Sequence, residues 1–157
     1  MSNRSVLYGG ACIGFILVIF LFSFWNPEKQ VRRHQRLLLS ALEDRDWDDF
    51  SELLAQNYSD RWGHDKAFVQ SRAAEVFRFF AVQITEEITR LDMLVDEAEV
   101  HARLRMQGRG GPLAEYAIMR ANALTEPWVF RWKKQSWKPW DWVLEHVDQP
   151  ELEITGI

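Results

Sequence analysis

An uncharged run from Val6 to Trp25 constrains this chain more than any other feature of its sequence. Sixteen of its twenty residues are apolar, and every Asp, Glu, Lys and Arg side chain lies outside it. As a helix it would rise about 30 Å, which matches the hydrocarbon core of a bilayer. Tyr8 and Trp25, near its two ends, suit the aromatic belts at the membrane interfaces. The run therefore predicts a transmembrane helix over residues 6–25 that contacts membrane lipid, after a short tail over residues 1–5.

A cleaved signal peptide is the main alternative for this run. The apolar part of such a peptide spans about 7–15 residues and ends in small side chains. This run is longer and ends in Ser23-Phe24-Trp25, so a retained single-pass anchor is favoured. The positive-inside rule favours, by a small margin, a cytoplasmic location for the domain after the run. The basic residues that favour it also suit the solvated face of a helix, which leaves the orientation open: Lys29, Arg32, Arg33 and Arg36.

Composition and spacing exclude several classes of function. The net charge of -4 argues against general nucleic-acid binding. The four histidines lie at least thirty residues apart, and no HExxH or CxxC spacing occurs, so neither a metal site nor a cofactor is expected. The glycine-rich segment 108–111 lacks the Lys-Ser/Thr pair of a phosphate-binding loop.

Three helices are predicted after the apolar run. The sequence Asn26-Pro27-Glu28 is typical of a helix start, and it predicts a helix over 27–43. Asp46 is expected to cap a second helix. A third helix is predicted over 66–81 from the spacing of its apolar residues.

Strand-like alternation dominates the rest of the chain. The first predicted strand carries a bulge near Thr89 or Arg90, because its apolar residues change parity there. Helices first and strands afterwards indicate an α+β domain over 27–148, with three helices on one face of an antiparallel sheet. An acidic tail over 149–157 is expected to be loosely held. The predicted strands cover residues 82–95, 98–106, 113–124, 128–132 and 140–147.

Three segments of this domain resemble the nuclear transport factor 2-like superfamily, also called the cystatin-like or SnoaL-like fold. They are Asp46–Leu54, Tyr58–Trp62 and Val129–Lys134 with the following Trp137, whereas Lys138–Trp142 departs from the usual turn. The resemblance covers residues 28–148. It implies a curved sheet rolled into a cone against helices, with a pocket between them and frequent dimerisation through the sheet. Members include isomerases, dehydratases and cyclases, but also binding and scaffold domains without activity.

An enzyme of that superfamily needs a pocket acid or base, often with a tyrosine as hydrogen-bond donor. The nearest candidates for catalysis are Tyr58, Asp60 and His64, and Tyr58 and Trp62 could line a ligand cavity. The alternative is that Asp60 and His64 are solvated loop residues while Tyr58 and Trp62 fill the core. Asp92 and His101, on predicted strands, are weaker candidates.

Two further patterns could form interaction surfaces. His101 shares its strand face with Glu99, Arg103 and Arg105, so this polar face either meets a second copy of the chain or is merely solvated. Five tryptophans between Trp128 and Trp142 either fill the core or contact a ligand or lipid headgroups. The sequence favours a membrane-anchored, noncatalytic domain that binds a partner protein or a small apolar ligand. The alternative is a tethered isomerase, dehydratase or cyclase.

Overall fold

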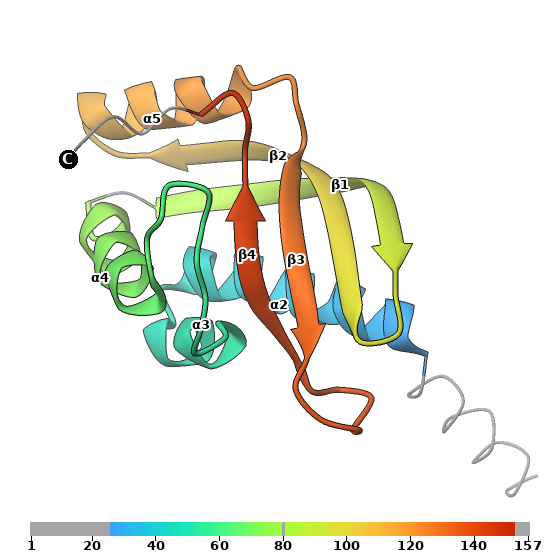
Figure 1. Cartoon of the computed structure of the whole chain (residues 1–157). Helices are drawn as coiled ribbons and strands as arrows, with labels where there is room; N and C mark the ends of the chain where they lie inside the picture. Colours follow the sequence, from blue (N-terminus) through green and yellow to red (C-terminus); the bar gives the residue numbers. More distant parts are fainter. Residues whose placement is uncertain (1–25, 80, 153–157) are drawn as a thin grey trace, which may run out of the picture.

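The computed structural model describes residues 26–79 and 81–152 (Figure 1). The predicted transmembrane helix over 6–25 lies outside these residues. Within the described ranges, no helix combines the length and the apolar character needed to cross a bilayer. The elements follow in the order α2 (Pro27–Asp44), α3 (Trp47–Leu53), α4 (Lys66–Phe77), β1 (Ala81–Met93), β2 (Glu97–Arg109), α5 (Pro112–Asn122), β3 (Trp128–Lys134) and β4 (Trp142–Asp148).

Side-chain caps begin the first three helices. Asn26 accepts a hydrogen bond from the backbone N–H of Lys29 at 3.2 Å, and Asp46 accepts one from Asp49 at 3.1 Å. These caps satisfy N–H groups that the helix itself leaves without partners, and they confirm both predicted starts. The third helix ends at Phe77, before the predicted residue 81, because Ala81 already begins strand β1.

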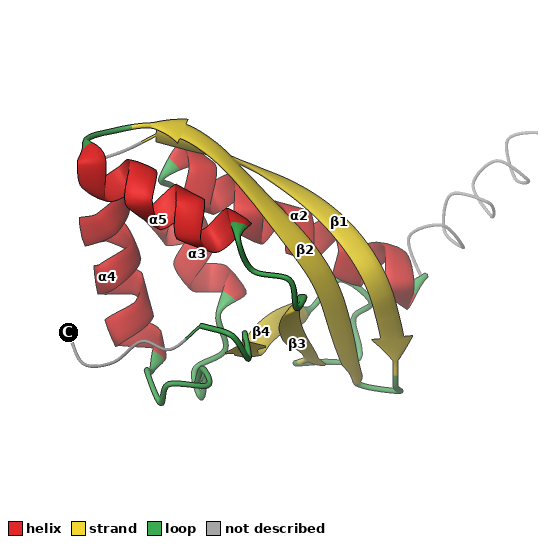
Figure 2. Cartoon of the chain, turned by 90° about the horizontal axis from the view of Figure 1, so that it is seen from above, coloured by secondary structure: helices red, strands yellow, loops and turns green. Residues whose placement is uncertain are grey.

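The four strands form one antiparallel sheet in the order β1-β2-β3-β4. β1 carries the predicted bulge, a register shift between Ile88 and Arg90. β1 and β2 pair along their whole length and curve over α2, as Figure 2 shows. β3 pairs only with the first part of β2, from Glu97 to Ala102. We call the sheet face toward α2 the inner face and the opposite face the outer face.

The strand predicted over 113–124 is wrong, since this segment forms helix α5. Pro112 occupies the first turn, and the residues after it are mostly good helix formers such as Leu, Ala, Glu, Met and Arg. Asn122 then uses its side-chain amide to bond both backbone groups of Met106, at 2.7 and 2.8 Å. The described domain therefore has four helices, and α5 lies beside the part of β2 that β3 does not reach (Figure 1).

The segment from Leu54 to Arg61 runs along the edge of β4 that faces away from β3. The backbone N–H groups of Ala55, Ser59 and Arg61 donate to the carbonyls of Leu144, Glu145 and Val147, at 2.9, 3.0 and 3.0 Å. This segment therefore covers the β4 edge and fixes the position of the loop after it.

Aromatic side chains fill the space between the helices and the inner face. Trp132 and Trp142 are 1% and 2% exposed, and Phe50 and Phe130 are buried beside them. The indole N–H of Trp132 donates to Oε1 of the fully buried Gln35 at 2.9 Å. The predicted alternation of Trp128, Phe130 and Trp132 toward the core is therefore confirmed, with Trp128 only partly buried, whereas Trp137 and Trp140 are exposed in the loop between β3 and β4.

The start of the predicted acidic tail is held more firmly than expected. Gln149 is fully buried and donates to the carbonyl of Glu126 at 2.8 Å. The carboxylate of Glu151 accepts from the backbone N–H groups of Thr125 and Glu126. Residues 149–152 therefore pack with the domain, and residues 153–157 lie outside the described residues.

Candidate functional site

Asp60 organises the loop that carries the predicted catalytic residues. Its buried carboxylate accepts two backbone hydrogen bonds through Oδ1, from Trp62 at 2.9 Å and His64 at 2.8 Å. Oδ2 lies 2.9 Å from Nδ1 of His64. Both carboxylate oxygens are thus engaged within the loop, which leaves Nε2 as the ring nitrogen of His64 that could exchange a proton with a substrate.

His64 and Trp62 are held in place by neighbouring rings and backbone. The imidazole of His64 stacks on Phe68 with 4.2 Å between ring centroids, and the centroid of the Trp62 ring lies 6.5 Å from that of His64. The indole N–H of Trp62 donates to the carbonyl of Leu152 at 2.9 Å. The structure therefore brings Asp60, Trp62 and His64 together, as the sequence predicted, in a packed loop.

Tyr58 belongs to the hydrophobic core instead of this loop. Its side chain is buried in one cluster with Leu54 and Phe130. Burial raises the pKa of the Tyr58 phenol far above its usual range, and the nearby Asp60 charge adds to the effect. The phenol is consequently neutral at physiological pH, and its ring contributes to packing.

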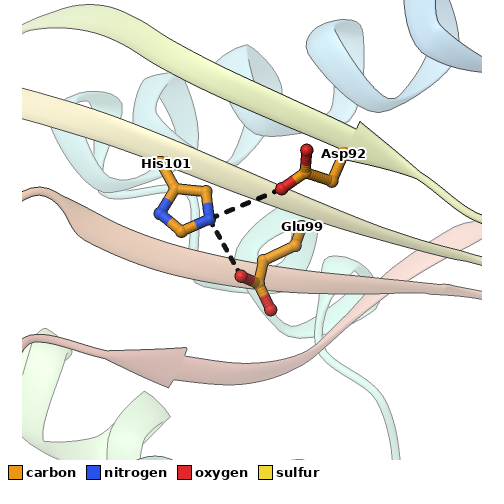
Figure 3. Close-up of side chains that lie close together, drawn as sticks. All are labelled: Asp92, Glu99 and His101. Carbon is orange, nitrogen blue, oxygen red and sulfur yellow. Dashed lines mark ion pairs between the residues drawn. The ribbon is translucent and has the colours of Figure 1, made fainter.

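A second group of titratable side chains lies on the outer face of the sheet (Figure 3). His101 Nε2 is 2.8 Å from Glu99 Oε1 and 3.9 Å from Asp92 Oδ2. The register after the β1 bulge creates this group, because it places Asp92 opposite Glu99. Asp92 and Glu99 come together only because their strands pair. Residue spacing along the sequence does not show which strands pair, so the sequence did not reveal this group.

One carboxylate oxygen or ring nitrogen from each of these three residues lies within 4.8 Å of the others. Carboxylates and imidazole can bind divalent metals. However, Arg90 pairs with Asp92 at 2.5 Å, and Arg131 pairs with Glu99 at 3.1 Å. The guanidinium of Arg90 also lowers the pKa of the Asp92 carboxyl group through its hydrogen bond. The group is therefore an ion-pair network, in which arginines already neutralise the carboxylates.

An open hollow of about 490 Å³ lies along this network. Lys133 and Glu145 form a further ion pair beside it, at 3.2 Å. Charges of both signs thus alternate across the outer face, which is the arrangement expected of a surface that can match a second charged surface. The charged residues that line the hollow are Arg90, Asp92, Glu97, Glu99, Arg131 and Glu145.

Glu86 is a carboxylate on the inner face that was not among the candidates predicted from the sequence. It shares the inner face of β1 with Ile84 and Ile88, so a polar residue at an otherwise apolar position was the available signal. Burial raises the pKa of the Glu86 carboxyl group, while Gln35, Arg36 and Arg32 oppose this rise. Glu86 lies close to Gln35, Arg36 and Arg32 of α2. It is on β1, whereas the Asp60–His64 loop follows the segment beside β4, at the opposite end of the sheet order.

Comparison with known proteins places the fold. No family model matches the sequence, and no curated protein matches it. Among solved structures, a conserved protein from Planctomyces limnophilus DSM 3776 has a TM-score of 0.63 at 12% identity, covering 78% of this chain and 93% of that one.

Two further structures carry the name of the fold. An NTF2-like protein from Cytophaga hutchinsonii ATCC 33406 has a TM-score of 0.57 at 12% identity, over 78% of this chain and 95% of its own. A candidate dehydratase of the NTF2-like family from Streptomyces avermitilis has a TM-score of 0.58 at 14% identity, over 77% and 93%. The described domain therefore has the α+β NTF2-like fold. Identities this low show the fold alone, and they assign no activity.

Proposed function

We propose that this chain is a membrane-anchored, noncatalytic NTF2-like domain that binds a partner protein. The observation that carries the proposal is the filled interior between the helices and the inner face of the sheet. Trp132 and Trp142 are almost fully buried there, together with Phe50 and Phe130. Because the space that would hold a substrate is occupied by side chains, we favour a partner protein over a small apolar ligand.

The outer face is the surface we assign to the partner, and a second copy of the chain is the partner we propose. A two-fold interface brings the same patch together from both copies, so a charged patch at such an interface must carry both signs of charge. The outer face meets this condition, because Arg131 and Lys133 on β3 lie between Glu99 on β2 and Glu145 on β4.

The test is the oligomeric state of the full chain in a mild nonionic detergent, measured by light scattering. We expect two copies per complex for the unmodified chain. Arg131→Glu should weaken the complex, and Glu99→Arg combined with Arg131→Glu should restore it. Arg72→Glu, on α4 and away from the sheet, is the matched control. A complex that ignores both outer-face variants would refute this interface, because contacts elsewhere would then hold it together.

The membrane anchor over 6–25 is part of the same proposal, with the domain on the cytoplasmic side. Its support is the length and apolar character of the run and the basic residues after it. Extraction with alkaline carbonate should leave the full chain in the membrane, and release of the chain would contradict the anchor. A reporter fused to the C-terminus should be active only in the cytoplasm if the orientation is correct.

An enzyme of the isomerase or dehydratase type is the second candidate, and the Asp60–His64 pair favours it. An aspartate that holds one imidazole nitrogen can leave the other poised for proton transfer. A structure named as a candidate dehydratase also shares the fold. Exchange of α-protons of enolisable ketones in D₂O, followed by NMR, separates the two functions. We expect no exchange above buffer; exchange that is lost in His64→Ala would establish the enzyme.

A further inference from the structure

Two neighbouring turns of the domain carry four exposed apolar side chains. Leu94 and Val95, in the turn between β1 and β2, are 68% and 89% exposed. Trp137 and Trp140, in the loop between β3 and β4, are 78% and 47% exposed. Large apolar side chains gathered at exposed turns are typical of surfaces that contact another apolar phase.

Both turns lie at the end of the domain where α2 begins, as Figures 1 and 2 show. The backbone N–H of Lys134 donates to the carbonyl of Asp96 at 2.9 Å, which ties the β1–β2 turn to the end of β3. Trp140 lines a hollow together with Arg33, His34 and Leu37 of α2. The two turns and α2 up to Leu37 therefore form one surface, which we call the anchor-side surface.

The sequence places the end of the predicted membrane span next to this surface. The span ends at Trp25, and the following residue, Asn26, already caps α2. If the span crosses a bilayer, the first turn of α2 lies within a few ångströms of the headgroups, since consecutive residues are about 3.8 Å apart. The anchor-side surface is then within reach of the same headgroups.

We propose that the tips of these two turns insert into the headgroup region of the bilayer that holds the anchor; this inference rests on the proposed function. Tryptophan suits this region because its ring is amphipathic, and leucine and valine gain from removal of their surface from water. The insertion fixes the domain against the membrane at two points besides the anchor. It thereby leaves the outer face of the sheet in a defined orientation.

The charges at this surface indicate which lipids it needs. Lys134 and Lys138 are accompanied by the acidic residues Asp96, Glu97 and Asp141. At the tips of the two turns these signs nearly balance, so attraction of the tips to anionic lipid is small. The α2 part of the surface is more basic, since it carries Arg33 and its basic neighbours, and it adds an attraction to anionic lipid that insertion of the tips does not need. The apolar tips therefore supply the contact, and vesicles of neutral phosphatidylcholine are expected to be sufficient.

Site-specific fluorescence on the full chain tests this contact. Cys12 is the only cysteine of the chain, so a Cys12→Ala background accepts one new cysteine at a time. Val95→Cys and Trp137→Cys carry a polarity-sensitive dye in separate preparations. Leu113→Cys is the matched control, because Leu113 is 81% exposed on α5, at the opposite end of the domain. Circular dichroism checks that each variant keeps its fold.

The chain is reconstituted into phosphatidylcholine vesicles with and without lipids that carry a nitroxide quencher. Groups seated in the headgroup and acyl boundary lie about 5–10 Å into the bilayer, so they should lose emission to the nitroxide, whereas a group in water should not. We therefore expect blue-shifted, quenched emission from positions 95 and 137, and neither effect at position 113. The same result is expected when a fraction of the lipid is replaced by phosphatidylserine.

The outcomes separate this inference from the anchor itself. If the chain resists carbonate extraction but positions 95 and 137 behave like position 113, the inserted turns are wrong and the anchor stands. If carbonate releases the chain, the anchor is wrong. In that case quenching at 95 and 137 supports the turns as a peripheral lipid contact, and its absence overturns them as well.

Discussion

The hydrogen bond between Gln35 and Trp132 allows a quantitative test of how the interior of this domain is held. Gln35 is fully buried on α2, and Trp132 is 1% exposed on β3. Their contact at 2.9 Å is a buried polar link between α2 and the sheet. Replacing Gln35 with leucine keeps a side chain of similar size but removes the acceptor.

The expected loss follows from the burial of the indole N–H. A buried donor that loses its partner costs about 1–3 kcal/mol, because it has given up water without a replacement. The melting temperature of a domain of this size shifts by about 4 °C for each kcal/mol. Gln35→Leu should therefore lower the melting temperature by about 4–12 °C.

A double-mutant cycle separates the hydrogen bond from general packing. Trp132→Phe removes the donor, so the double variant leaves neither group without a partner. Its loss should be smaller than the sum of the two single losses by about 1–2 kcal/mol. The measurement is denaturant unfolding of the full chain in mild detergent, followed by far-ultraviolet circular dichroism. Gln83→Leu, at an exposed position of β1, controls for the change of residue type.

Strict additivity of the two single losses would refute the reasoning. It would mean that the indole N–H finds another acceptor when Gln35 is replaced, or that the contact contributes nothing to the free energy of unfolding. A loss for Gln83→Leu as large as that for Gln35→Leu would also refute it, since burial would then not be the cause.

Three further substitutions test the loop, the inner carboxylate and one close backbone contact. Asp60→Ala should cost about 2–3 kcal/mol in denaturant unfolding, because it removes the acceptor of two backbone N–H groups and the partner of His64. Glu86→Gln should raise the melting temperature at pH 7. Burial raises the pKa of Glu86 in the folded protein, so the folded protein binds this proton more tightly than the unfolded chain does. The stability of the unmodified protein therefore falls as pH rises above the pKa that Glu86 has in the unfolded chain. The gain in melting temperature from Glu86→Gln should accordingly vanish near about pH 4. Gly108→Ala should lower the melting temperature by the equivalent of about 1–3 kcal/mol, because a Cβ there would meet the backbone oxygen of Ala81.

Each of these has a control within the chain. Asp60→Asn keeps an acceptor for the backbone N–H groups and should lose less than Asp60→Ala. Glu87→Gln, at the exposed neighbouring position, should show no comparable gain at pH 7. Gly111→Ala adds a Cβ where nothing lies within 4 Å, so an equal loss there would contradict the packing explanation for Gly108.

The parts of the fold that could be predicted from the sequence are those set by local chemistry. The caps Asn26 and Asp46 fix helix starts through bonds to residues three positions away. The β1 bulge near Arg90 follows from the parity of neighbouring apolar residues. The loop of Asp60 and His64 could likewise be predicted because its members lie within five positions of one another.

The parts that could not be predicted depend on distant neighbours. Segment 113–124 has apolar residues that fit either period, and the contact of Asn122 with Met106 helps to select the helix. The grouping of Asp92 with His101 needs the register between two strands. The exposure of Trp137 is equally invisible in sequence, since the same residue type fills the core at position 132.

The segment from Leu54 to Arg61 along β4 limits how copies of this domain could polymerise. A sheet grows by addition of strands at an edge whose backbone groups are unpaired. The β4 edge already bonds that segment, and Asn122 bonds the backbone of β2 at Met106, beyond the part of β2 that pairs with β3. Among the described strands, β1 alone presents a long lateral edge. Pairing through β1 would join two copies and then stop, so this topology opposes open-ended fibres.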